Sequence, residues 1–289
     1  MSAETGSVPA RRRVQISRYV QLAESVQIEE MAERFGVSVM TIHRDLDVLA
    51  SEGWLEKTRG GAKATALRLH ERNVKLRWRQ QNAEKRALAR AALSHLRPGL
   101  TLAMDDSTTV AAMLPLLGTL RPLTVITNFL PALVRAAADP DIDVIGLGGQ
   151  FDRSLDSFEG PAGIDQLRSL SADAVVMSPS AVHRGSLFHP STYTARRKHA
   201  LLEIGELKML LVDSTKFERR ATHRLGSVEL FDLVLVDSGV SEENIESITS
   251  LGVEVEVVKV TPEDRAAPPL EGCDLHRLLL DPPSRTPPP

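Results

Sequence analysis

The chain has 289 residues, which is enough for two ordinary domains. Hydrophobic residues make up 42% of it, so a substantial core can form, and its one cysteine, Cys273, excludes an intrachain disulfide. No apolar run approaches the length of a membrane span, and no signal segment opens the chain. We therefore expect a cytoplasmic protein with no membrane partner.

Charge is unevenly distributed along the chain. The formal net charge is −3, yet residues 1–80 carry 14 Lys and Arg against 10 Asp and Glu, and residues 81–289 carry a net charge of −7. A basic N-terminal part on an acidic body is typical of a protein in which one domain meets nucleic acid.

Residues 1–12 lack apolar periodicity, and we expect them to form a disordered arm. Arg11, Arg12 and Arg13 then open a predicted helix. They form either a solvated charge run or a basic arm that contacts phosphate groups, and the sequence leaves both interpretations open.

Residues 13–67 carry apolar side chains at the spacing of three short helices. The expected buried residues are Ile16, Tyr19, Val20 and Ala23 in the first helix, Ile28, Met31, Ala32 and Phe35 in the second, and Val39, Ile42, Leu46 and Leu49 in the third. Gly36 suits the left-handed residue that ends the second helix, and Ser38 suits the N-cap of the third. This pattern indicates a helix-turn-helix.

A hairpin is expected directly after the third helix. Residues 53–57 alternate as a strand, residues 58–61 can turn the chain, and residues 62–67 can return as a second strand. The basic side chains of this hairpin are Lys57, Arg59 and Lys63. The hairpin is either the wing of a winged helix-turn-helix or a plain hairpin that closes the small core, and one hairpin can serve both purposes.

The third helix presents a polar face away from its apolar stripe. An ordinary amphipathic surface helix would look similar, but the preceding helix and the hairpin favour recognition of a DNA major groove. The predicted DNA-contacting residues are Ser38, Met40, Thr41, His43, Arg44, Lys57 and Arg59.

Residues 30–62 resemble the N-terminal domain of the DeoR family of bacterial transcription regulators. That family typically has Val-Ser, two variable residues, then Thr-Ile-Arg-Arg-Asp-Leu. The matching residues are Val37, Ser38, Thr41, Ile42, Arg44, Asp45 and Leu46. His43 stands where the family usually has arginine, and histidine cannot make the same bidentate contact to guanine.

Residues 68–97 are predicted to be helical and to connect the DNA-binding part to a second domain, residues 98–260. Short apolar runs alternate with helical stretches across that domain. The predicted strands are 100–104, 123–127, 144–147, 174–177, 209–212, 233–236 and 253–258. Because these runs are apolar on both faces, the pattern indicates a doubly wound α/β domain with a mostly parallel sheet.

Polar or glycine residues follow nearly every predicted strand. They are Asp105-Asp106, Thr127-Asn128, Gly148-Gly149, Ser178, Asp213 and Asp237. Such residues are common in turns, but in open α/β sheets the ligand crevice lies at these strand ends. Residues 105–109 offer three hydroxyl groups at a helix start, and Lys216 offers a cation, so both clusters suit a phosphate.

These clusters also resemble the DeoR effector domain, which is similar in fold to ribose-5-phosphate isomerase and CoA transferases. The resemblance implies that a sugar phosphate binds Asp105, Ser107, Thr108, Thr109, Thr127, Asn128, Gly148, Gly149 and Lys216. Ser107 replaces a family glycine, which is awkward if that position needs a positive φ. Arg197 and Lys198 would make a nearby edge more basic, where the family often has an acidic residue before its lysine.

Residues 261–289 hold eight of the 17 prolines and are predicted to be a flexible tail. Motifs of phosphate loops, dinucleotide sites and catalytic nucleophiles are missing, so we expect no cofactor. His183, His189 and His199 lie in a segment predicted to be long and irregular, which argues against a metal site.

We therefore predict a DNA-binding transcription regulator and not an enzyme. It would be a repressor of a carbohydrate operon, a homo-oligomer of two or four chains, and released from DNA by a phosphorylated sugar. Two alternatives stay open: a sugar-phosphate isomerase with Asp105 or Asp106 as base and Lys216 as electrophile, and a regulator whose effector crevice is vestigial.

Overall fold

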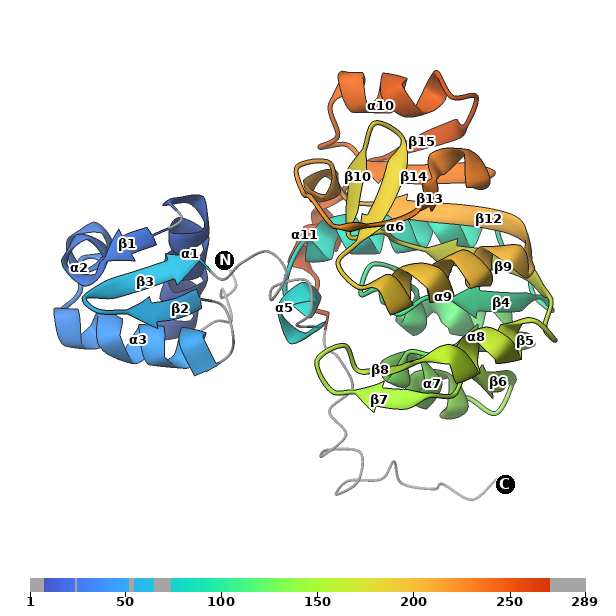
Figure 1. Cartoon of the computed structure of the whole chain (residues 1–289), viewed down its shortest axis with the longest axis horizontal. Helices are drawn as coiled ribbons and strands as arrows, with labels where there is room; N and C mark the ends of the chain where they lie inside the picture. The colour runs from blue at the N-terminus through green and yellow to red at the C-terminus, as the bar shows by residue number, and fades with distance from the viewer. Residues whose placement is uncertain (1–7, 24, 52–54, 65–73, 271–289) are drawn as a thin grey trace. The chain divides into compact units, whose positions relative to one another are not determined.

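The computed structural model describes residues 8–23, 25–51, 55–64 and 74–270 (Figure 1). The chain divides into two compact units, Met1–Arg77 and Trp78–Pro289. Among the described residues, no helix is both long and apolar enough to cross a membrane.

The first unit is a winged helix-turn-helix, as predicted. Its elements are α1 (Val8–Ala23), β1 (Ser25–Gln27), α2 (Ile28–Phe35), α3 (Val39–Ser51), β2 (Leu55–Thr58) and β3 (Gly61–Ala64). The three strands pair antiparallel in the order β1-β3-β2. Strand β1 was not predicted, because three residues between two helices carry too little alternation to be recognised.

The core of the first unit follows the predicted helical stripes with two exceptions. Ile16, Met31 and Ile42 are fully buried, but Ala23 is exposed and Val39 keeps 42% of its surface exposed. The predicted burial of Val39 is wrong because it is the first residue of α3, one turn before the residues that reach the core. Gly36 has φ 62°, so the predicted left-handed end of α2 is confirmed.

Two helices follow the hairpin in sequence, within the segment 68–97 that was predicted to hold connecting helices. They are α5 (Val74–Trp78) and α6 (Asn82–Ser94), and Gln81 between them has the left-handed φ of 49°. No glycine or proline marks this break, so the sequence pattern does not reveal it. Leu76 belongs to the core of the first unit, whereas Trp78 stacks on Phe129 in the second.

The second unit is built on a seven-stranded sheet whose pairings are all parallel. Its strands are β4 (Thr101–Met104), β5 (Leu123–Thr127), β6 (Ile142–Gly146), β9 (Ala172–Met177), β12 (Gly205–Val212), β14 (Leu233–Asp237) and β15 (Glu254–Val258). The order is β15-β14-β12-β9-β4-β5-β6, and all seven predicted runs became strands. The predicted α/β fold class is confirmed.

The strand order reverses between β4 and β9. Later strands extend from β4 toward β6 on one side, and from β9 toward β15 on the other. Right-handed crossovers therefore place helices on both faces of the sheet. The helical segments are η1 (Val110–Leu120), α7 (Leu130–Ala137), α8 (Pro161–Leu167), α9 (Thr192–Glu203), η2 (Ser214–Lys216), η3 (Val228–Leu230) and α10 (Glu242–Thr249).

Two small antiparallel sheets lie beside the main sheet, and neither was predicted. One is β7 (Gln150–Asp152) with β8 (Ser157–Glu159). The other is β10 (Ala181–His183), β11 (Ser186–His189) and β13 (His223–Ser227). The histidines that we placed in an irregular segment therefore lie on β10, β11 and α9, because strands of three or four residues leave too short a pattern to recognise.

The predicted tail begins too early, because residues 261–266 are ordered. Helix α11 (Pro262–Ala266) starts with a capping box formed by Thr261 and Asp264. The Asp264 carboxylate also accepts two hydrogen bonds from Arg90 of α6. Residues 271–289 lie outside the described part of the chain.

The Arg90–Asp264 ion pair should make the free energy of unfolding depend on pH. Burial raises the pKa of Asp264, but hydrogen bonds from Arg90 and Thr261 lower it to about 2. A depressed pKa contributes stability above the ordinary aspartate value, and this contribution is lost as the pH falls from about 4 to about 2. We expect Asp264→Asn to lower the free energy of unfolding by about 2 kcal/mol at neutral pH and to flatten its acid dependence.

Urea unfolding of the second unit, followed at several pH values from 7 to 3, measures this contribution. Glu263→Gln is the matched control, since Glu263 is the exposed neighbour on the same helix. An Asp264→Asn protein with the same acid profile as the wild type would contradict the assignment.

Candidate functional site

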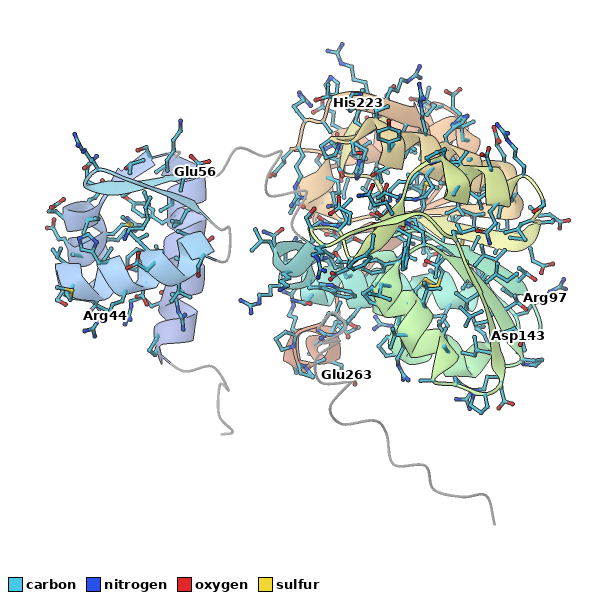
Figure 2. The ribbon with its side chains drawn as sticks, turned by 60° about the horizontal axis from the view of Figure 1, so that its bottom comes forward. Arg44, Glu56, Arg97, Asp143, His223 and Glu263 are labelled. Atoms are coloured by element: carbon cyan, nitrogen blue, oxygen red, sulfur yellow. The ribbon has the colours of Figure 1, made fainter. Side chains whose placement is uncertain are left out.

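The exposed face of α3 is shaped by its first turn. The Ser38 hydroxyl accepts a hydrogen bond from the Thr41 amide at 3.2 Å, which confirms Ser38 as the N-cap. The Ser38 and Thr41 hydroxyl oxygens also lie 2.9 Å apart. Met40 keeps 63% of its surface exposed, and Arg44 projects from the outer side of the unit (Figure 2). Polar, apolar and cationic groups thus stand together on one free helix face.

Helix α3 is tied to α1 by a carboxylate. Asp45 is buried, and its Oδ2 accepts a hydrogen bond from Nε of Arg12 at 2.6 Å. Arg13 lies 3.9 Å from the same carboxylate. Arg12 and Arg13 are therefore ion-pair partners of Asp45 within the unit. They fit neither the solvated charge run nor the phosphate-contacting arm that the sequence left open. The Arg11 side chain is outside the described residues.

The wing carries the other predicted basic residues. Lys57 Nζ lies 2.5 Å from Asp47 Oδ1 on α3, so this ion pair links the wing to the helix. Arg59 and Lys63 are exposed, and His43 is half-buried. The structure gathers Ser38, Met40, Thr41, His43 and Arg44 on α3 and leaves Lys57 and Arg59 on the hairpin.

In the second unit, a cluster of buried charges lies where the strand order reverses. Asp105 follows β4 and Ser178 follows β9, which are neighbours in the sheet. Asp105 Oδ2 accepts hydrogen bonds from the Ser178 amide at 2.8 Å and from the Lys198 ammonium group, while Oδ1 accepts one from the Ser107 amide at 2.9 Å. Both oxygens of Asp105 are thus occupied, and Lys198 joins α9 to the ends of β4 and β9.

A second ion-pair cluster surrounds Arg197. Its guanidinium group lies 2.9 Å from Asp106 and also contacts Glu159 on β8. Burial raises the pKa of Glu159, and Asp106 adds to the rise, while Arg197 opposes it. Lys198 lies 3.3 Å from Asp106, so the two clusters share that carboxylate.

Two further basic side chains, Lys85 and Lys216, lie by the ends of β4 and β12. Lys85 of α6 is buried and donates a hydrogen bond to the Thr108 hydroxyl at 3.0 Å. Lys216 is buried and lies 3.9 Å from Asp213. Burial raises the pKa of Asp213, but the positive charges of Lys216, Arg219 and Lys85 lower it by more. The pKa of Asp213 therefore lies below its ordinary value. Lys85 and Lys216 therefore act on the same carboxylate.

Several predicted site residues hold the backbone in place. The Thr127 hydroxyl accepts a hydrogen bond from the Phe129 amide at 3.1 Å, and the Asn128 side chain donates to the Phe158 carbonyl at 3.0 Å. Gly149 has φ 145°, and a Cβ there would meet the Glu159 carbonyl at 2.3 Å. These groups fix β8 and thereby the position of Glu159. Gly148 is exposed, and its amide donates to Gln166.

Ser107 is accommodated without a positive φ. Its backbone is not among the left-handed residues, and its hydroxyl accepts a hydrogen bond from the Val110 amide at 3.1 Å. The replacement of the family glycine therefore caps the start of η1. Thr109 is buried beside it.

Sequence reasoning missed Lys85 and Glu159 as site residues, and treated Arg197 and Lys198 only as a basic edge. Nothing in the sequence brings these residues to the strand ends, since they lie on α6, β8 and α9. The Ser178 hydroxyl is also buried and has no hydrogen-bond partner among the described residues. Within the same part of the chain, no group of three or more His, Cys, Asp or Glu residues could hold a metal ion.

Known proteins match both units. Residues 12–66 match the DeoR-like helix-turn-helix domain, and residues 80–238 match the DeoR C terminal sensor domain. The putative aga operon transcriptional repressor of Escherichia coli O157:H7 is 26% identical over 86% of this chain and 94% of its own length. The glycerol-3-phosphate regulon repressor of Escherichia coli K12 is 29% identical over 80% of this chain and 92% of its own. The L-fucose operon activator of the same strain is 29% identical over 74% and 88%.

Solved structures are more distantly similar. Ribose 5-phosphate isomerase A from Neisseria gonorrhoeae aligns at 12% identity over 48% of this chain and 55% of that chain, with a TM-score of 0.35. The eIF2B beta subunit from Chaetomium thermophilum aligns at 15% identity over 78% and 61%, with a TM-score of 0.38. The two domain matches cover most of the described chain, and this protein belongs to the DeoR family of transcriptional regulators.

Proposed function

We propose that this protein represses a carbohydrate operon and that a phosphorylated sugar bound in the second unit releases it from DNA. One observation carries the proposal: four buried basic side chains lie by the ends of β4, β9 and β12, at and beside the reversal of strand order. They are Lys85, Arg197, Lys198 and Lys216. Such a reversal is the usual ligand crevice of an open α/β sheet, and buried cations there suit an anionic ligand.

The charges of the crevice indicate how an effector would act. The basic groups contact Asp105, Asp106, Glu159 and Asp213, so without an effector the carboxylates neutralise them. A phosphate would compete with these carboxylates for the same donors and so rearrange α9 and β8. Thr108 and Thr109 at the start of η1 add donors for phosphate oxygens.

The names of the relatives support a phosphorylated sugar as the effector. Their names refer to the aga operon, the glycerol-3-phosphate regulon and the L-fucose operon, and two of these three are called repressors. Glycerol 3-phosphate is itself a phosphorylated polyol, which is the chemistry that the crevice suits.

DNA binding rests on the free face of α3. Met40 and Arg44 on this face offer an apolar contact to a thymine methyl group and hydrogen bonds to guanine. We propose that the protein acts as a homo-oligomer, because one helix and one wing bury too little surface for operator selectivity.

We propose no catalytic role. An isomerase would need a free carboxylate base, but both oxygens of Asp105 accept hydrogen bonds, and Asp106 is shared by Arg197 and Lys198. Incubation with ribose 5-phosphate should give no ketose product above background.

The connection between the units suggests how the signal passes. Trp78 stacks on Phe129 with ring centroids 5.9 Å apart, and Phe129 follows Asn128 at the crevice. Two residues before Trp78, Leu76 is part of the core of the first unit. A shift of Phe129 would therefore reach the DNA-binding unit through one short helix, α5.

Replacing Arg44 with Ala should weaken specific DNA binding by about 1–3 kcal/mol if this side chain contacts a base. The non-specific affinity should change much less. Fluorescence anisotropy with operator and scrambled duplexes at fixed salt separates the two terms. Arg97→Ala is the control, since Arg97 is exposed in the second unit. Equal operator affinities for the Arg44→Ala protein and the wild type would reject α3 as the recognition helix.

Replacing Lys85 with Met should weaken effector binding by about 1.5–3 kcal/mol, because one charge-assisted hydrogen bond to the phosphate is lost. Operator binding without effector should be retained. Thermal shift against a panel of sugar phosphates identifies the ligand, and calorimetry then measures its affinity. Lys259→Met is the control on an exposed lysine. An undiminished affinity in Lys85→Met would place the phosphate elsewhere.

Replacing Trp78 with Ala should reduce the coupling between effector and operator while leaving each binding event measurable. Wild-type couplings of this kind are typically about 1–3 kcal/mol. Trp78→Phe, which keeps an aromatic ring against Phe129, should retain most of the coupling. Operator affinity measured with and without saturating effector gives the coupling directly. Full coupling in Trp78→Ala would show that the signal takes another route.

A further inference from the structure

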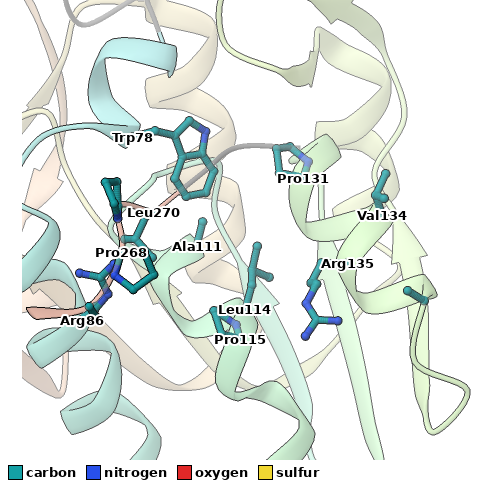
Figure 3. Close-up of a pocket in the computed structure, with 13 residues that line it drawn as sticks. Trp78, Arg86, Ala111, Leu114, Pro115, Pro131, Val134, Arg135, Pro268 and Leu270 are labelled. Atoms are coloured by element: carbon teal, nitrogen blue, oxygen red, sulfur yellow. The ribbon is translucent and has the colours of Figure 1, made fainter. Parts of the chain in front are cut away.

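A groove of about 530 Å³ lies between η1, α7 and the segment after α11 (Figure 3). Its walls are mostly apolar, with Leu114 and Pro115 on η1, Val134 on α7 and Pro268 after α11. A volume of this size and an apolar lining are typical of small-molecule sites. The groove is distinct from the crevice, although η1 begins at the crevice and runs along the groove.

The groove is also electropositive. Only two of its lining residues are charged, and both are arginines, Arg86 and Arg135. Arg86 donates a hydrogen bond to the Asp264 backbone carbonyl at 3.1 Å, while the Asp264 carboxylate is held by Arg90.

Arg135, like Arg86, lies near a carboxylate that another arginine already holds. The nearby Asp139 carboxylate accepts a hydrogen bond from Nε of Arg121 at 2.8 Å. Each arginine of the groove therefore neighbours a carboxylate that already has another arginine as its partner. The result is a surplus of positive charge along an apolar wall, and this surplus suits an anion with a hydrocarbon body.

Trp78 supplies a further polar group. The side chain is 5% exposed and forms part of the groove wall, and its indole N–H has no hydrogen-bond partner among the described residues. Trp78 therefore serves as a fluorescent reporter on the groove wall.

From these features we infer that the groove is a second ligand site, for a small carboxylate with an aliphatic chain. The chain would lie on Leu114, Pro115 and Val134, and the carboxylate would pair with Arg135, which lies at the opposite end of the groove from Arg86 (Figure 3). A phosphorylated sugar does not suit the site, because its hydroxyl groups would face apolar side chains without partners. The inference does not depend on the proposed function.

Tryptophan fluorescence gives a direct test on the full chain. The protein has two tryptophans, and Trp54→Phe leaves Trp78 as the only one. Decanoate, added below its micelle concentration, should produce a saturable change in Trp78 emission, whereas methyl decanoate should bind at least tenfold more weakly. The Lys85→Met protein should respond to decanoate as the wild type does, which separates this site from the sugar-phosphate crevice.

Two substitutions localise the carboxylate. Arg135→Gln, on an exposed side chain, should weaken decanoate binding at least fivefold, whereas Arg86→Gln, at the other end of the groove, and Arg168→Gln, on an exposed arginine elsewhere, should change it less than twofold. Circular dichroism checks that each variant is folded, and Arg135→Gln carries the test if Arg86→Gln is not.

Several results would overturn the inference. They are the absence of a saturable response, an equal response to the methyl ester, and an affinity that Arg135→Gln leaves unchanged. A response that arises only in a chain ending at Leu270 would assign the groove to residues 271–289 and not to a ligand.

Discussion

The ion pair between Lys198 and Asp105 is the contact on which the second unit most depends. Both side chains are at most 3% exposed, and they join α9 to the ends of β4 and β9, where the strand order reverses. Removing one partner of such a pair leaves a buried charge uncompensated and typically costs about 3–5 kcal/mol. Hydrophobic residues of similar volume often hold a fold as well as a buried ion pair does, so charges at this position fit the proposed effector role.

This constraint organises the rest of the crevice. Arg197 and Lys198 are adjacent on α9, so the helix presents two cations to Asp105, Asp106 and Glu159 at once. Lys85 brings α6 to Thr108 at the start of η1. An effector that recruits any of these donors would therefore disturb contacts between several elements. Trp78 of α5 stacks on Phe129, which follows Asn128 at the crevice.

The sequence predicts the framework well because the framework is made of local patterns. Each strand of the main sheet is an apolar run bounded by turn residues, and Gly36 and Ser38 signal the helix-turn-helix through local hydrogen bonding. Asp105 and its neighbours are visible because they end a strand. By contrast, Glu159 reaches the crevice only because Gly149 and Asn128 fix β8, which is a tertiary effect. The burial of Lys85 could not be predicted either, because the sequence of its helix appears amphipathic and basic.

The most direct test of the account is a gel shift with the promoter DNA beside the protein's own gene, repeated with a panel of sugar phosphates. We expect a specific shift that one phosphorylated sugar releases, and retention of that shift when the same sugar is added to the Lys85→Met protein. A specific shift that no sugar phosphate alters, in a protein that binds none of them, would contradict the central claim that the buried cations form an effector site.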